Sequence, residues 1–152
     1  MSTWVRSTLI AFAISLPLSH LVLADDKALA ALKKSADALW SVLAAPGVSP
    51  EHPSKELKKS LERPIYLTGW VIPNEYESGE LVSFLLARYP SGCVHVPLPP
   101  PSNIVHVVMN EKSSKLKNIG STKKVLVHGI IHSGGRVDSS YEMEADSIQE
   151  AI

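Results

Sequence analysis

The chain has 152 residues, enough for one ordinary domain, and 45% of its residues are hydrophobic, which is sufficient for a buried core. Its 15 basic residues are balanced by 15 acidic residues, so the formal net charge is zero. This balance argues against a nucleic-acid-binding surface and against a polybasic membrane-binding patch, because both need clustered positive charge.

The N-terminus has the parts of a secretory signal peptide. Arg6 supplies positive charge, residues 9–23 form an apolar run, and the small residue Ala24 precedes two aspartates. The run has the length of a signal-peptide core and is short for a membrane span. We expect residues 1–24 to be cleaved off, which leaves 14 basic and 15 acidic residues. The mature protein is expected to lie in the periplasm and not to span the membrane.

Residues 25–63 are expected to form an N-terminal helix and a connector. Apolar side chains recur every three or four residues between 25 and 45, which predicts an amphipathic helix that docks on its own domain. Pro46-Gly47 ends this helix. The connector, residues 46–63, contains three prolines and a predicted short helix at 54–61.

Residues 64–150 have the pattern of a small β domain. Short apolar or alternating runs predict five strands, at 65–72, 81–89, 104–109, 125–132 and 141–148. Turn signals lie at Pro73-Asn74 and at 77–79, Gly69 is expected at a bulge or a close backbone approach, and 113–119 is expected to form helical turns. Five strands with a small helix between the third and fourth match the element order of an OB-like barrel, so the predicted fold class is mainly β.

An unusual motif separates the second and third predicted strands, and residues 89–105 read Tyr-Pro-Ser-Gly-Cys-Val-His-Val-Pro-Leu-Pro-Pro-Pro-Ser-Asn-Ile-Val. In this motif the chain resembles an exported bacterial family called domain of unknown function 3299, whose pattern is Cys-Ile-His-Val, a proline run and Asn-Gln-Ile-Val. Leu98 interrupts the proline run, and Ser102-Asn103 replaces Asn-Gln. The resemblance covers about residues 36–150. It implies an exported OB-like domain that acts as an accessory to envelope transport, and it does not point to any catalysed reaction. The matching residues are Cys93, His95, Val96, Pro97, Pro99, Pro100, Pro101, Ile104 and Val105.

Cys93 and His95 are the best candidates for chemistry. They are two residues apart on an extended stretch, so their side chains share one face, and a thiolate and an imidazole are ligands for zinc or copper. A metal site needs more ligands: His106, beyond the proline turn, is the expected third, and His128 or His132 is a candidate fourth. The sequence thus predicts a metal site, zinc first with copper as the alternative, in a carrier or accessory for a membrane transporter or another envelope protein.

Two other interpretations of this segment stay open. The Cys-x-His pair can be purely structural, in a protein-interaction module that binds its partner through Pro99, Pro100, Pro101 and Asn103. Alternatively, Cys93 is a redox or nucleophilic thiol, although the Cys-x-x-Cys pattern of disulfide oxidoreductases is absent from the sequence. Export would place Cys93 in an oxidising compartment. Because it is the single cysteine of the sequence, it cannot form an internal disulfide.

Overall fold

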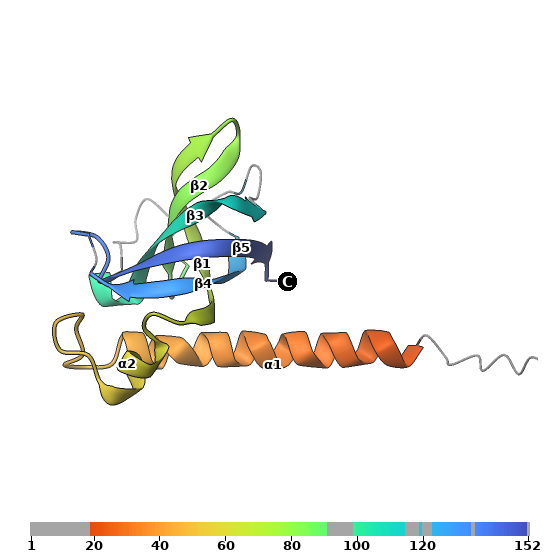
Figure 1. The fold of residues 1–152 in the computed structure, drawn as a ribbon, viewed down its shortest axis with the longest axis horizontal. Coiled ribbons are helices and arrows are strands. Elements are labelled where there is room, and N and C mark those ends of the chain that lie inside the picture. The colour runs from red at the N-terminus through yellow and green to blue at the C-terminus, as the bar shows by residue number, and fades with distance from the viewer. Residues whose placement is uncertain (1–18, 91–98, 115–118, 120–122, 135, 152) are drawn as a thin grey trace, which may run out of the picture.

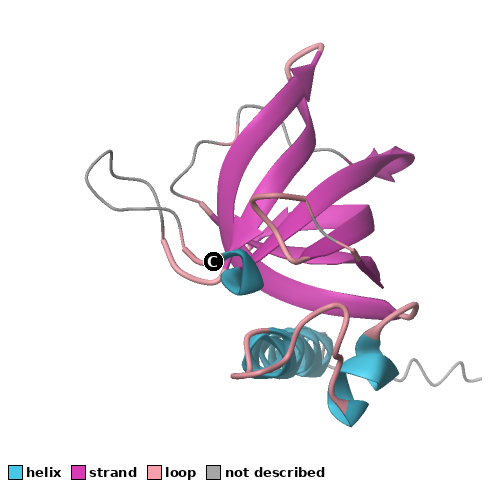
Figure 2. Ribbon diagram, turned by 90° about the vertical axis from the view of Figure 1, so that its left-hand side faces the viewer, coloured by secondary structure: helices cyan, strands magenta, loops and turns pink. Residues whose placement is uncertain are grey.

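The structure is a computed structural model that describes residues 19–90, 99–114, 119, 123–134 and 136–151. It is a barrel of strands with helices packed on one side (Figure 1, Figure 2). Cys93 and His95 lie outside the described residues, as does most of the predicted signal peptide, so cleavage after Ala24 stays a prediction. Within the part of the chain that the structure describes, no helix is long and apolar enough to cross a membrane.

Five strands form a closed barrel in the order β1-β2-β3-β5-β4. All pairs of neighbouring strands are antiparallel except β3 and β5, which are parallel. This is the OB-like barrel that the sequence predicts. The elements are α1 (Ser19–Leu43), α2 (Lys55–Ser60), β1 (Pro64–Glu77), β2 (Glu80–Ala87), the short 3-10 helix η1 (Pro101–Asn103), β3 (Ile104–Ser114), β4 (Lys124–Ser133) and β5 (Tyr141–Glu150).

The helix α1 docks on the barrel through its C-terminal half, whereas its N-terminal half extends beyond the strands (Figure 1). Trp40 and Leu43 are buried in the same hydrophobic core as the inward-facing strand residues. The Trp40 indole N–H donates to the Thr68 carbonyl at 2.6 Å, and the Tyr141 hydroxyl donates to the Leu43 carbonyl at 3.2 Å. The amphipathic stripe therefore packs on its own domain, as the sequence predicts.

The polar side of α1 is also bonded to the barrel. Asp37 accepts a hydrogen bond from the Thr68 hydroxyl and pairs with the Lys124 ammonium at 3.1 Å. Burial raises the pKa of the Asp37 carboxyl, but the Thr68 hydrogen bond and the Lys124 bond and charge outweigh it, so this pKa lies below its usual value.

We expect Asp37→Asn to lower the free energy of unfolding at neutral pH by about 1 kcal/mol, a modest loss because the Asp37 side chain is 52% exposed and solvent screens the pair. Since the pKa of Asp37 is depressed in the folded state, its contribution is complete above the unfolded-state pKa and is lost as the pH falls through the folded-state pKa. Urea unfolding of both proteins from about pH 7 to about pH 2.5 checks this. A stability difference that stays constant over that range would contradict it.

The structure differs from the sequence predictions at three places. The predicted turn at Pro73-Asn74 is wrong: β1 continues through it with a register shift between Pro73 and Glu75, and a bulge tolerates proline because it interrupts the hydrogen-bond ladder. The predicted helical turns at 113–119 are wrong for 113–114, which continue β3, and 115–118 lie outside the described residues. Finally, α1 already begins at Ser19, ahead of the predicted start.

Two local predictions in the barrel are confirmed. Ser78 and Gly79 both have positive φ, 51° and 80°, so they form the tight turn between β1 and β2. Gly69 is a close backbone approach, because a Cβ there would lie 2.7 Å from the Leu86 Cγ atom and 2.8 Å from the Ala87 carbonyl oxygen.

Candidate functional site

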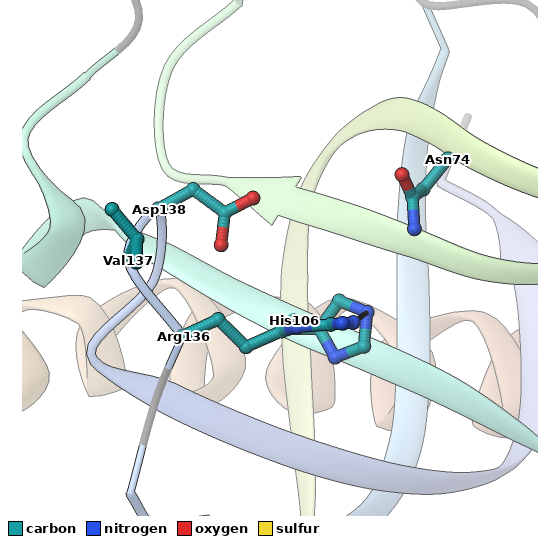
Figure 3. Close-up of a pocket in the computed structure, with 5 residues that line it drawn as sticks. All are labelled: Asn74, His106, Arg136, Val137 and Asp138. Atoms are coloured by element: carbon teal, nitrogen blue, oxygen red, sulfur yellow. Dashed lines mark hydrogen bonds between the residues drawn. The ribbon is translucent and has the colours of Figure 1, made fainter.

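A pocket of about 440 Å³ lies over β3, between β1 and the β4–β5 connection. OB folds bind oligonucleotides and oligosaccharides on the face of strands 2 and 3 and the loops beside it, and this pocket shares β3 and the β4–β5 connection with that region. Figure 3 shows Asn74 and Asp138 on opposite sides of the pocket and His106 between them. The lining residues are Asn74, His106, Arg136, Val137 and Asp138.

His106 sits on the outer face of β3, because its neighbours Val105 and Val107 point into the core. It is nevertheless only 3% exposed. Its Nε2 atom lies 2.9 Å from the Ser83 hydroxyl and 3.2 Å from an Arg136 guanidinium nitrogen, the contact drawn in Figure 3. A buried imidazole on the outer face of a strand is therefore held in a polar network.

The bulge in β1 brings Asn74 into this network. The Asn74 amide donates to the Ser83 hydroxyl at 3.3 Å, and Asn74 is the residue that the register shift leaves without a partner in the β1–β2 ladder. The proline-asparagine pair that the sequence marks as a turn thus orients a pocket side chain instead.

The strand register places a carboxylate between two histidines. His106 on β3 is in register with Glu142 on β5, and Glu142 is in register with His132 on β4. The three residues form a row across adjacent strands on the outer face of the barrel, which we call the His-Glu-His row. The His106 Nδ1 atom lies 3.5 Å from a Glu142 carboxylate oxygen.

Both histidines of the His-Glu-His row have one buried ring nitrogen without a hydrogen-bond partner. These atoms are His106 Nδ1 and His132 Nε2, and they stand out because nearly all buried polar atoms in native proteins are hydrogen-bonded. The other nitrogen of each ring does have a partner: His132 Nδ1 lies 2.8 Å from a Glu62 carboxylate oxygen, and His106 Nε2 contacts Ser83 and Arg136.

His128 lies outside this row. It is in register with Ser147, its Nδ1 atom lies 2.7 Å from an Asp146 carboxylate oxygen, and its ring is 4.4 Å from the Tyr66 ring. Of the two candidate fourth ligands, the strand register therefore brings His132 toward His106 and leaves His128 apart.

The described residues contain no group of three or more His, Cys, Asp or Glu side chains close enough to hold a metal ion. His106 and Glu142 are close, but His132 is turned to Glu62. Sequence reasoning missed Glu142, Ser83 and Arg136, because only strand pairing and the β4–β5 connection bring them to His106. The clean alternation of 141–148 was the one usable signal, since it placed Glu142 on the solvent side of β5.

The prolines predicted to bind a partner lead into β3. Residues 101–103 form η1, the Pro101 carbonyl accepts from the Ser140 N–H at 3.0 Å, and the Asn103 carbonyl accepts from the Arg88 N–H at 3.0 Å. The Asn103 N–H donates to the Pro100 carbonyl at 2.8 Å. These bonds fix the end of the β2–β3 connection to the barrel, and the partner-binding role stays a prediction.

The model of the family described as "Protein of unknown function (DUF3299)" matches residues 19–150 of this chain. The chain belongs to the DUF3299 family. This match confirms the family predicted from the cysteine-histidine-proline motif. No curated protein matches the sequence of this DUF3299 protein at a significant level.

Two solved structures are similar to this DUF3299 protein. A crystal structure of a DUF3299 family protein from Pseudomonas aeruginosa PAO1 has 24% identity and a TM-score of 0.55, covering 91% of this chain and 84% of that chain. A crystal structure of asparaginyl-tRNA synthetase from Pyrococcus horikoshii has 15% identity and a TM-score of 0.36, covering 70% of this chain and 22% of that chain. The first supports the fold, and we infer nothing from the second.

Proposed function

We propose that this DUF3299 protein binds a transition metal, zinc first, at the His-Glu-His row, and that it acts in the periplasm as a carrier or as an accessory to an envelope transporter. The observation that carries the proposal is the pair of buried, unpartnered imidazole nitrogens on the two sides of Glu142. Leaving such an atom without a partner costs about 1–3 kcal/mol, and a metal ion bound to both nitrogens removes that cost.

The spacing of His106 and Glu142 suits a shared metal ion. Zinc binds imidazole nitrogen at about 2.0–2.1 Å and carboxylate oxygen at about 2.0–2.2 Å, so two ligand atoms on a tetrahedral ion are about 3.3–3.5 Å apart. His106 Nδ1 and the Glu142 oxygen are separated by 3.5 Å and make no hydrogen bond. The pair thus has the separation of two ligands rather than the geometry of a hydrogen bond.

The partners of the two rings favour the same interpretation. A histidine that binds a metal usually donates its other ring N–H to a carboxylate or another acceptor, which orients the ring and leaves the metal-binding nitrogen unprotonated. Glu62 is in that position for His132. The Ser83 hydroxyl can take that position for His106 when Arg136, which can only donate, is not bonded to the same Nε2 atom. Because His132 faces Glu62, its Nε2 atom would have to approach Glu142 for the row to bind one ion.

Cys93 and His95 are the proposed completing ligands, although they lie outside the described residues. The connection that contains them is closed by the hydrogen bond between Arg88 and Asn103, three residues before His106. Cys93 follows Arg88 by five residues, which span at most about 18 Å when extended. The chain length therefore allows the thiolate to reach the His-Glu-His row.

Equilibrium dialysis against micromolar zinc, followed by metal analysis, tests the proposal on protein purified after expression of the full chain. We expect about one equivalent of zinc in the wild type, and at least about tenfold weaker binding in Glu142→Gln, His132→Gln and Cys93→Ser. Glu142→Gln is the gentlest of these changes, because it keeps the shape of a half-exposed side chain and removes only its charge.

His52→Gln is the matched control, since His52 is exposed in the connector and far along the chain from the row. It should bind zinc like the wild type. A wild type that retains less than about a tenth of an equivalent would overturn the proposal. Loss of binding in Cys93→Ser alone, with the row variants unaffected, would place the site elsewhere.

A further inference from the structure

A turn in the β4–β5 connection presents a guanidinium and a carboxylate to the pocket over β3, which we call the first pocket. Arg136 and Asp138 come from this turn, and Asn74 comes from the bulge of β1 on the other side of His106 (Figure 3). Two hydrogen bonds close the turn: the Ser139 N–H donates to the Arg136 carbonyl at 3.2 Å, and the Arg136 N–H donates to the Ser139 hydroxyl at 3.4 Å. The backbone that carries these side chains is therefore fixed before a ligand binds, which lowers the entropy cost of binding.

Most of the hydrogen-bonding capacity of the first pocket is unused within the part of the chain that the structure describes. The Arg136 guanidinium has five N–H donors, and its side-chain hydrogen bond to a described residue goes to His106. No described residue pairs with the Asp138 carboxylate, and none donates to the Asn74 side-chain carbonyl, since the Asn74 amide donates to Ser83. A ligand that fits this pocket must therefore offer acceptors to the guanidinium and donors to a carboxylate and an amide carbonyl.

A second pocket, of about 340 Å³, adjoins the first at Arg136, which lines both. It lies between the connector and the β4–β5 connection, where Glu51 supplies another carboxylate and Ser49 and Ser140 supply hydroxyl groups. Each pocket is larger than about 300 Å³, the lower end of the range for small-molecule sites. The two pockets together can therefore take a ligand that consists of more than one ring.

The charges of the two pockets favour a neutral ligand. Among the described lining residues Arg136 carries the one fixed positive charge, whereas Asp138 and Glu51 are acidic, so an anion such as a phosphate group would be repelled. A purely cationic ligand would leave the N–H donors of the guanidinium without acceptors. A hydroxyl group both donates and accepts, so a neutral molecule rich in hydroxyl groups satisfies the guanidinium and the carboxylates together.

We infer that the two adjoining pockets bind a neutral oligosaccharide. One sugar ring lies over His106, between Asn74 and the turn that carries Arg136, and the next ring lies in the second pocket beside Glu51. Oligosaccharides are also among the ligands that OB barrels bind on the face of strands 2 and 3 and the loops beside it. This inference goes beyond metal binding and does not depend on it, because Glu142 lines neither pocket.

Titration of the wild type with sugars gives the first measurement. Amide ¹H–¹⁵N spectra of protein purified after expression of the full chain are recorded with maltotriose, cellotriose and triacetylchitotriose, three neutral trisaccharides with different hydroxyl arrangements. A metal chelator in every sample keeps the measurement independent of zinc. We expect at least one trisaccharide to bind with a Kd of about 1 mM or tighter. The amide signals that shift should cluster at Asn74, at Glu51 and at residues 136–140.

The affinity of variants for the same trisaccharide gives the second measurement. Arg136→Gln and Asp138→Asn should each bind it at least about tenfold more weakly, because each change removes a charged hydrogen-bonding partner of the sugar. Both side chains are exposed, so both variants should keep the circular dichroism spectrum and the stability of the wild type. Arg63→Gln is the matched control, because it removes the same charge from an exposed residue that lines neither pocket, and its affinity should equal that of the wild type.

Three results would overturn the inference. These are the absence of shifts with all three trisaccharides at about 10 mM, shifts that cluster away from the two pockets, and a loss of affinity that Arg63→Gln reproduces. Binding of glycine or inorganic phosphate at these residues in place of the trisaccharides would assign the pockets to a charged ligand and would also overturn it. A protein that binds a trisaccharide but no zinc would instead reject the proposed metal-binding function and support the oligosaccharide site.

Discussion

Replacing Trp40 by alanine should lower the free energy of unfolding by about 3–5 kcal/mol, the range for removing a large buried aromatic side chain. Trp40 is 2% exposed, belongs to the barrel core, and donates its indole N–H to the Thr68 carbonyl. Natural domains have a total stability of only about 5–15 kcal/mol, so this one change removes a large part of it. The physical reason is that the barrel core contains Trp40 and Leu43 of α1 as well as strand residues, so the core is incomplete without the helix.

Urea unfolding followed by circular dichroism measures this loss. Leu32→Ala is the matched control, because Leu32 lies on the same helix but is 37% exposed, and its truncation should change stability by less than about 0.5 kcal/mol. Trp40→Phe keeps an aromatic ring and should cost about 1–3 kcal/mol, since the Thr68 carbonyl loses a hydrogen bond. Equal stability of Trp40→Ala and Leu32→Ala would mean that α1 is not docked on the barrel in solution.

Gly129→Ala should destabilise the protein by at least about 3 kcal/mol, above the usual cost of overpacking. A Cβ atom at this position would lie 2.2 Å from the Glu144 carbonyl oxygen and 2.8 Å from the Ala145 Cα atom. Both are backbone atoms of the neighbouring strand β5, so no side-chain rotation can make room. The strands β4 and β5 would have to separate beside the register shift between His128 and Gly129.

Thermal unfolding of Gly129→Ala, together with its soluble yield, measures the effect. Ser133→Ala serves as the control on the same strand, since Ser133 is exposed at the end of β4 and its change should be nearly neutral. A melting temperature of Gly129→Ala close to that of the wild type would show that β4 and β5 are not packed at this distance.

Much of the fold could be predicted because its signals are local. The alternation of Tyr141, Met143 and Ala145 with acidic residues marks one buried face of β5, and these three side chains are indeed in the core. The turn at Ser78-Gly79 follows from residues that accept positive φ. The bulge in β1 was not predictable, because proline and asparagine have the same local preferences in a turn and in a bulge, and only the pairing with β2 decides between them.

The sequence by itself determined the family, the mainly β class, the amphipathic first helix, and His106 as a site candidate, since each of these depends on neighbouring residues or on a contiguous motif. Only the tertiary structure decided which residues meet His106. The parallel pairing of β3 with β5 and the antiparallel pairing of β5 with β4 place Glu142 between His106 and His132, and the β4–β5 connection adds Arg136. These contacts join segments far apart in the chain. The alternation of apolar residues fixes which face of each strand is buried, but which residues of two distant strands lie opposite each other is decided only when the strands pair.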